Sequence, residues 1–240
     1  MFLYFNAYHQ QALALRGNHD DAAISANYFR RKKGGALLAS TPTPPPHLSE
    51  LGASVSDDYL ARWGWVDNLT PDEVAWLASL PYSITLPFAV GKKHPGGVLL
   101  VHAGVVPGKA IEQQSLRDLT HMRNLATMRE ECAQATPSST TPAKATLGDA
   151  RESSFLALEK DLPGSVAWAS VWRGPRHIYF GHDAKRQLQQ EAFATGLDTG
   201  CLYGRELTAA VLPAGDIVSV PALATYVEPP ERVDMGYKKK

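Results

Sequence analysis

Three short apolar runs, each followed by a turn that contains glycine and histidine, constrain the fold of this 240-residue chain more than any other feature. The three pairs of run and turn are Ala12–Leu15 with Gly17–Asp20, Val98–Val101 with His102–Gly104, and His177–Phe180 with Gly181–Ala184. Short apolar runs bounded by such turns are typical of buried strands. Because α/β sheets carry functional side chains where strands end, we expect Asn18, His102 and His182 each to stand where a strand runs out into a loop.

Each segment alone also has a plain structural explanation. Gly17 and Asn18 could simply supply the backbone angles of a strand-exit turn, with His19 exposed beside them. The combination is more informative, because three units that each deliver a polar ligand type occur in one chain with eight histidines. We therefore interpret Asn18, His102 and His182 as parts of one site.

The segments between these turns predict helices. The expected helices are Asp57–Ala61, Pro71–Leu80 and Ile111–Arg129. Thr70 is the expected N-cap of the second helix, and Pro71 occupies its first turn. Residues Val166–Trp172 lead into the strand before His182, and the helical spacing of Trp168 and Trp172 favours core packing over cofactor binding.

The C-terminal part is richer in predicted strands. Its short apolar runs, separated by glycine and proline turns, predict antiparallel strands at Glu191–Leu197, Leu207–Leu212 and Asp216–Val220. This mixture favours a layered α/β architecture, with two sheets packed face to face between helices. We expect residues 1–240 to form a single domain with a Pro-rich loop at 40–46 and a low-complexity surface insert at 133–154.

Composition excludes several classes of partner. The formal net charge is zero, and Arg30–Lys33 and Lys238–Lys240 are too short for a nucleic-acid patch, so a polyanion would have to be bound locally. Cys132 and Cys201 are expected to be free thiols in a reducing compartment. No run approaches the roughly 20 apolar residues of a membrane helix, and Met1–Phe5 is too short for a secretory signal. We expect a cytoplasmic protein, with a vacuolar location as the alternative.

Five sequence blocks together carry a family resemblance. They are Leu15–Asp20, Val101–Gly108, Leu119–Asn124, Tyr179–Ala184 and Gly196–Gly204. On these blocks the chain resembles the calcineurin-like metallophosphoesterases of the phosphoprotein-phosphatase superfamily. The closer match is to the branch of bacterial diadenosine tetraphosphatases, called ApaH-like, which includes fungal polyphosphatases. The resemblance implies a four-layer α/β/β/α sandwich and two divalent transition metals, which would be Mn, Zn or Fe.

The chain departs from that family near its start. Members carry an Asp-x-His motif and a Gly-Asp motif before the GNHD segment, whereas residues 1–16 contain no aspartate. The resemblance therefore implies that the first metal lacks its ligands and that the first strand or strands of the sandwich are missing. We expect an N-terminally incomplete chain, from which any targeting segment would also have been lost.

The remaining predicted ligands are neutral. Paired metal ions in such sites sit about 3.5–4 Å apart and hold a hydroxide that attacks phosphorus. Asn18, His102 and His182 offer one amide and two imidazoles, a set that suits zinc, manganese or iron better than magnesium or calcium. We expect at most one weakly held ion, and little or no activity from this chain alone.

Three residues of the GNHD and HMRN segments, together with Arg16 just before GNHD, also have expected roles. By the resemblance, His19 is the general acid that protonates the leaving oxygen, a role suited to an imidazole that titrates near neutrality. Asp20 is expected to be an exposed turn residue rather than a substitute for the missing aspartate that orients His19. Arg123 could bind a substrate phosphate through its guanidinium fork, or it could be a surface residue of an amphipathic helix. Arg16 is interpreted as structural.

The leading hypothesis is a metal-dependent phosphoesterase that hydrolyses phosphoanhydride or phosphomonoester bonds through a metal-bound hydroxide. Inorganic polyphosphate and dinucleoside polyphosphate are its expected substrates. The first alternative is a catalytically dead module that keeps the phosphate site for binding. The second is a protein serine/threonine phosphatase, which is disfavoured because Thr120–Asn124 and Gly196–Cys201 resemble the tetraphosphatase branch more closely.

Overall fold

The computed structural model describes residues 2–5, 11–49, 55–87, 96–127 and 155–228. The insert predicted at residues 133–154 and Cys132 lie outside these ranges, whereas Cys201 is a free thiol. In the described ranges, no helix is both long and apolar enough to cross a bilayer.

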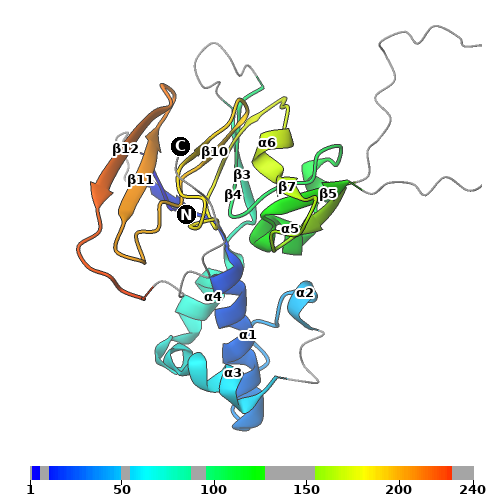
Figure 1. The fold of residues 1–240 in the computed structure, drawn as a ribbon. Coiled ribbons are helices and arrows are strands. Elements are labelled where there is room, and N and C mark those ends of the chain that lie inside the picture. The colour runs from blue at the N-terminus through cyan, green and yellow to red at the C-terminus, as the bar shows by residue number, and fades with distance from the viewer. Residues whose placement is uncertain (1, 6–10, 50–54, 88–95, 128–154, 229–240) are drawn as a thin grey trace, which may run out of the picture.

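The described residues form a mixed α/β structure, as the sequence predicts. The helices are α1 (Asn18–Lys33), α2 (Pro46–Ser49), α3 (Asp57–Arg62), α4 (Pro71–Ser79), α5 (Leu116–His121) and α6 (Trp168–Val171), with 3-10 helices η2 (Gly64–Asn68) and η3 (Ile111–Gln113). The strands are β1 (Phe2–Phe5), β2 (Gln11–Ala14), β3 (Ser83–Leu86), β4 (Val98–Val101), β5 (Asn124–Thr127), β6 (Phe155–Leu158), β7 (Val166–Ala167), β8 (His177–Phe180), β9 (Gln189–Gln190), β10 (Ala194–Gly196), β11 (Glu206–Val211) and β12 (Asp216–Pro221). Helices α1, α3 and α4 gather at one end of the molecule, below the sheets (Figure 1).

A five-stranded sheet with the order β3-β4-β8-β10-β9 occupies the centre. Strands β4 and β8 are parallel neighbours, with Leu99 opposite Ile178, and every residue of both strands is buried. Burial on both faces explains why these two runs are continuously apolar or aromatic rather than alternating. Because parallel strands end at the same edge, β4 and β8 deliver His102 and His182 to one place.

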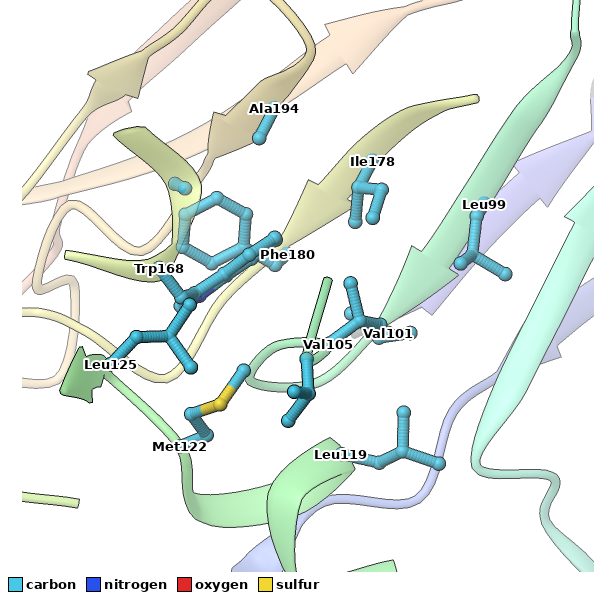
Figure 2. Close-up of a cluster of buried hydrophobic side chains, with 12 residues drawn as sticks. Leu99, Val101, Val105, Leu119, Met122, Leu125, Trp168, Ile178, Phe180 and Ala194 are labelled. Atoms are coloured by element: carbon cyan, nitrogen blue, oxygen red, sulfur yellow. The ribbon is translucent and has the colours of Figure 1, made fainter. Parts of the chain in front are cut away.

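The two faces of the central sheet bury different side chains, because successive residues of a strand point to opposite sides. One face contributes Leu99, Val101, Ile178 and Phe180 to the cluster in Figure 2, where Trp168 packs edge-to-face on Phe180 with ring centroids 4.7 Å apart. The other face carries Val98, Leu100 and Tyr179, which pack with Leu15 and with Ala210 and Leu212 at the β11 ribbon. The β11–β12 ribbon therefore faces the central sheet, and the core role predicted for Trp168 is confirmed.

Helices α3 and α4 confirm two sequence predictions. The hydroxyl of Thr70 accepts from the Glu73 N–H at 3.2 Å, and the Glu73 carboxylate accepts from the Thr70 N–H at 2.8 Å. This reciprocal pair, with Pro71 at the first position, fixes the start of α4.

The continuous helix expected at Ile111–Arg129 was wrong over its described part. A second helix start at Ser115, whose hydroxyl accepts from the Asp118 N–H at 3.0 Å, separates η3 from α5. After α5 the chain becomes β5, which pairs antiparallel with β6 and β7 and so joins a three-stranded sheet. Pairing with distant segments overrides the local helical pattern.

The C-terminal strands are largely as predicted. Strands β11 and β12 form an antiparallel ribbon from Glu206↔Pro221 to Val211↔Asp216. The strand expected over Glu191–Leu197 is shorter, and β10 runs parallel to β8 while pairing antiparallel with β9. Parallel pairing arises because the chain leaves the end of β8 and returns through β9 before β10 begins.

Candidate functional site

Three side chains from distant parts of the chain meet at the edge where β4 and β8 end. Asn18 is the first residue of α1, His102 follows β4, and His182 lies two residues after β8. Nε2 of His102 is 2.9 Å from Oδ1 of Asn18 and 3.2 Å from Nδ1 of His182. The structure therefore brings together the three residues that the sequence predicts as ligands.

The segment around Asn18 differs from the expected strand-exit loop, because helix α1 begins at Asn18 itself. The Gly17 N–H donates to the Asp20 carboxylate at 2.7 Å, which closes the first turn of this helix. Asp20 is thus a helix-start residue, and the expectation of an exposed turn residue was wrong. A Cβ on residue 17 would lie 2.7 Å from the His102 ring, so glycine is needed for the close approach of His102.

A hydrogen bond to the backbone and an unusual backbone conformation fix the orientation of His182. Its Nε2 lies 3.1 Å from the His121 carbonyl oxygen, and because a carbonyl only accepts, the neutral ring carries its proton on Nε2. The lone pair of Nδ1 then faces Nε2 of His102, on the side where a metal would lie. His182 also adopts a left-handed backbone with φ of 67°, an uncommon conformation for a residue with a side chain.

Burial keeps both imidazoles neutral. Burial lowers the pKa of His102 well below its usual value, and the neighbouring His182 lowers it further. Burial also lowers the pKa of His182 to about 3, with the charge of Arg123 as the next cause. Neutral imidazoles are the form that binds metals, so the ring nitrogens are available as ligands at neutral pH.

The spacing of the donor atoms can be compared with that around one transition-metal ion. With metal–nitrogen bonds of about 2.0–2.1 Å, two ligand atoms on a tetrahedral ion lie about 3.4 Å apart. Nε2 of His102 lies 3.2 Å from Nδ1 of His182 and 2.9 Å from Oδ1 of Asn18, so these atoms would move apart slightly to hold an ion. Among the described residues, no group of three or more His, Cys, Asp and Glu side chains is placed to hold a metal. A metal here would depend on the Asn18 amide beside the two imidazoles, without an anionic ligand from these three residues.

His19 lies beside this centre rather than within it. Its side chain is exposed and its ring centroid is 5.9 Å from that of Trp63. His19 is one of the lesser causes that lower the pKa of His102 and of His182, so it lies within electrostatic range of both. The His19 side chain also lines an open cavity of about 730 Å³.

Arg123 is held next to His182 by backbone carbonyls. Its Nη2 donates to the His182 oxygen at 3.2 Å and its Nη1 to the Glu159 oxygen at 3.3 Å. It lies between α5 and β5, so the alternative that it belongs to an amphipathic helix was wrong. The half-buried guanidinium supports the turn that presents His182.

A buried polar network under the start of α1 was not anticipated from the sequence. Asp21 is fully buried, accepts from the Tyr82 hydroxyl at 2.9 Å, and lies 3.2 Å from Nε2 of His47. Arg16 donates to the same hydroxyl at 2.9 Å and stacks over the Tyr82 ring at 4.8 Å, which agrees with a structural role. The signal in the sequence was the second acid of the GNHDD segment, since a buried carboxylate needs partners.

Comparison with known proteins points to one family. No model of a known protein family matches the chain. An asymmetrical bis(5'-nucleosyl)-tetraphosphatase of Anoxybacillus flavithermus is 37% identical over 72 residues, which are 29% of each chain. A symmetrical bis(5'-nucleosyl)-tetraphosphatase of Methylobacillus flagellatus is 32% identical over 152 residues, covering 52% of this chain and 55% of that protein.

A solved structure extends the similarity along most of the chain. This crystal structure, provisionally named a diadenosine tetraphosphatase, superposes with a TM-score of 0.51 and 29% identity, over 88% of this chain and 68% of the other. In sequence and fold the chain is similar to the ApaH-like metallophosphoesterases. This similarity supports the branch expected from the five sequence blocks and confirms the α/β fold class.

The two curated relatives are named as hydrolases. The chain spans only 29% and 55% of their length. Its site residues are therefore interpreted from their own geometry.

Proposed function

We propose that this chain supplies a divalent-metal site and a general acid for the hydrolysis of a phosphoanhydride bond in a dinucleoside polyphosphate. The convergence of Asn18, His102 and His182 on one point carries the proposal, because three oriented lone-pair donors are the minimum for a metal site with open positions. The names of the relatives, which are bis(5'-nucleosyl)-tetraphosphatases, support this choice of substrate.

The neighbouring residues can perform the remaining chemistry. A transition-metal ion held by Asn18, His102 and His182 would supply a Lewis acid that stabilises charge on a phosphoryl oxygen. His19, which is exposed beside that point, would protonate the leaving phosphate oxygen. Arg123 would bind a phosphate oxygen through the part of its guanidinium that faces away from the two carbonyls.

The neutrality of the ligand set favours the binding-module alternative over efficient turnover by these residues alone. An amide and two neutral imidazoles leave the charge of a divalent ion uncompensated until a phosphate arrives. We therefore expect weak metal binding that phosphate strengthens, and slow or absent hydrolysis by residues 1–240. Inorganic polyphosphate is the alternative substrate.

Two measurements on the same preparation test the proposal. Calorimetric titration with Mn²⁺, Zn²⁺ or Co²⁺ should show binding at one site that His102→Ala abolishes. Phosphate release from diadenosine tetraphosphate, inorganic polyphosphate and p-nitrophenyl phosphate is then measured with each metal, using His19→Ala as the comparison. Metal binding without release would favour the binding module, and metal binding that survives His102→Ala would overturn the site itself.

A further inference from the structure

The cavity that begins at His19 is walled by three tryptophans, and we propose that it binds the nucleobase of a nucleotide substrate. Trp63, Trp65 and Trp76 come from the segment between α3 and η2, from η2 itself and from α4. This inference rests on the proposed function, because it names the part of the substrate that lies beside the phosphates. We refer to Trp63, Trp65 and Trp76 as the tryptophan pocket.

The tryptophans are presented to solvent although buried neighbours anchor their backbone. Trp65 and Trp76 are each 50% exposed, whereas Val66 and Val74 from the same two elements are 0% and 2% exposed. The side chains of Val66 and Val74 therefore lie in the core, whereas the indole rings of Trp65 and Trp76 point outward. Tryptophan is usually largely buried, so two half-exposed indoles lining one cavity indicate a ligand surface rather than packing.

The pocket has the size and chemistry for a planar ring. Its volume of about 730 Å³ lies within the usual range of small-molecule sites. The Trp63 and Trp65 ring centroids are 5.8 Å apart with the planes tilted by 43°, so the two rings form a bent wall. Aromatic walls of this kind stack nucleobases, because every base offers a π-face.

The pocket lies near the proposed metal ligands. His19, which lines the cavity, directly follows Asn18 at the start of α1 and lies within electrostatic range of His102 and His182. A nucleotide whose ring lies against the tryptophans would therefore direct its phosphates toward Asn18, His102 and His182. Inorganic polyphosphate has no ring for this surface, so the tryptophan pocket favours a nucleotide over it.

The charges around the pocket are compatible with an anionic ligand. Asp20 and Glu73 line it, but each carboxylate accepts a helix-start N–H, from Gly17 at 2.7 Å and from Thr70 at 2.8 Å. The helix N-termini partly offset these negative charges. Arg62 also lines the pocket and can meet the phosphate next to the base.

A matched pair of ligands isolates the base from the phosphate. Adenosine 5'-monophosphate and ribose 5-phosphate differ only in the adenine ring, and neither contains a phosphoanhydride bond. Their affinities are measured by calorimetry on the full chain, on the double variant Trp65→Leu/Trp76→Leu, and on Tyr226→Leu. The last variant removes an aromatic side chain that is 59% exposed and does not line the cavity. Thermal unfolding of each variant verifies that it folds, and either single tryptophan variant replaces the double one if that protein is unfolded.

We expect the full chain to bind the adenine compound about tenfold more tightly than ribose 5-phosphate, as stacking on an aromatic wall predicts. This ratio should fall to within about twofold in the double variant and persist in Tyr226→Leu. Equal affinities in the full chain, or a ratio unchanged by the double variant, would overturn the inference. A preserved ratio together with metal binding that survives His102→Ala would instead count against the proposed function and leave the base subsite standing.

Discussion

Nε2 of His102 lies 3.2 Å from Nδ1 of His182, while the opposite nitrogen of His182 lies 3.1 Å from the carbonyl oxygen of His121. The carbonyl fixes one proton of His182 on the far side of its ring. Two imidazole nitrogens consequently face each other across a gap in which at most one proton fits, and Asn18 closes the third side. This arrangement makes the site sensitive to charge, to protonation and to small changes in packing.

Replacing Asn18 with aspartate should strengthen metal binding. The carboxylate keeps an oxygen at the position of Oδ1 and adds the negative charge that the three ligands lack, at a helix N-terminus that favours anions. We expect Asn18→Asp to lower the Kd for Mn²⁺ at least tenfold in calorimetric titration. Asn68→Asp adds the same charge in η2 and should leave the Kd unchanged. An unchanged Kd in Asn18→Asp would mean that Asn18 is not a ligand.

Adding one methyl group at Gly17 should disturb the site without changing any ligand. The new Cβ would lie 2.7 Å from Cε1 and Nδ1 of the His102 ring, so the ring must move. We expect Gly17→Ala to cost about 1–3 kcal/mol of unfolding free energy in urea and to weaken metal binding. Gly64→Ala is the control, because a Cβ there meets nothing within 4 Å. Equal stabilities of the two variants would refute the steric role of Gly17.

The metal-free protein should lose stability as the pH falls below about 6.5. Burial lowers the folded-state pKa of His102 and His182, the latter to about 3, whereas an unfolded histidine titrates near about 6.5. At pH values between the folded-state and unfolded-state pKa, the unfolded chain binds more protons than the folded chain. The unfolding free energy therefore falls on acidification, by up to about 1.4 kcal/mol per pH unit for each histidine.

Urea unfolding at pH 7.5, 6.5 and 5.5 with a chelator measures this slope. His182→Asn removes one titrating group and retains a residue type that tolerates the left-handed backbone at position 182. The variant should show a shallower loss of stability than the unmodified chain. Indistinguishable slopes would show that His182 does not carry the pH dependence.

Removing the Tyr82 hydroxyl should destabilise the start of α1. That hydroxyl donates to the buried Asp21 carboxylate and accepts from Arg16, so Tyr82→Phe leaves two buried groups short of a partner. We expect a cost of about 1–3 kcal/mol in the free energy of unfolding. Tyr226→Phe, at an exposed tyrosine, should cost little. A loss below about 0.5 kcal/mol for Tyr82→Phe would show that water replaces the hydroxyl.

The sequence predicted those parts of the fold whose pattern is local. The runs that became β4 and β8 are apolar because the structure buries them on both faces, and the Thr70–Glu73 start of α4 is a local motif. Helix α1 was not predicted, because it buries polar residues and lacks an apolar stripe. Those buried polar residues are Asp21, Ser25 and Asn27.

The remaining differences come from long-range contacts. Strand β5 forms because β6 and β7, some thirty to forty residues later, pair with it. No local pattern in Asn124–Thr127 predicts that pairing. For the site, turn motifs were enough to group Asn18, His102 and His182. The tryptophan pocket was missed because the sequence does not show which of two adjacent apolar residues is buried. The structure places Trp65 at the surface and Val66 in the core.

The parallel pairing of β4 with β8 would also make metal binding depend on strand alignment. Leu99 lies opposite Ile178, and His102 and His182 follow these strands by fixed distances along the chain. A slip of one residue would turn each side chain of the slipped strand to the other face and separate His102 from His182. Any ion that needs both imidazoles would bind only the correctly aligned sheet, and so would draw misaligned molecules toward it by mass action.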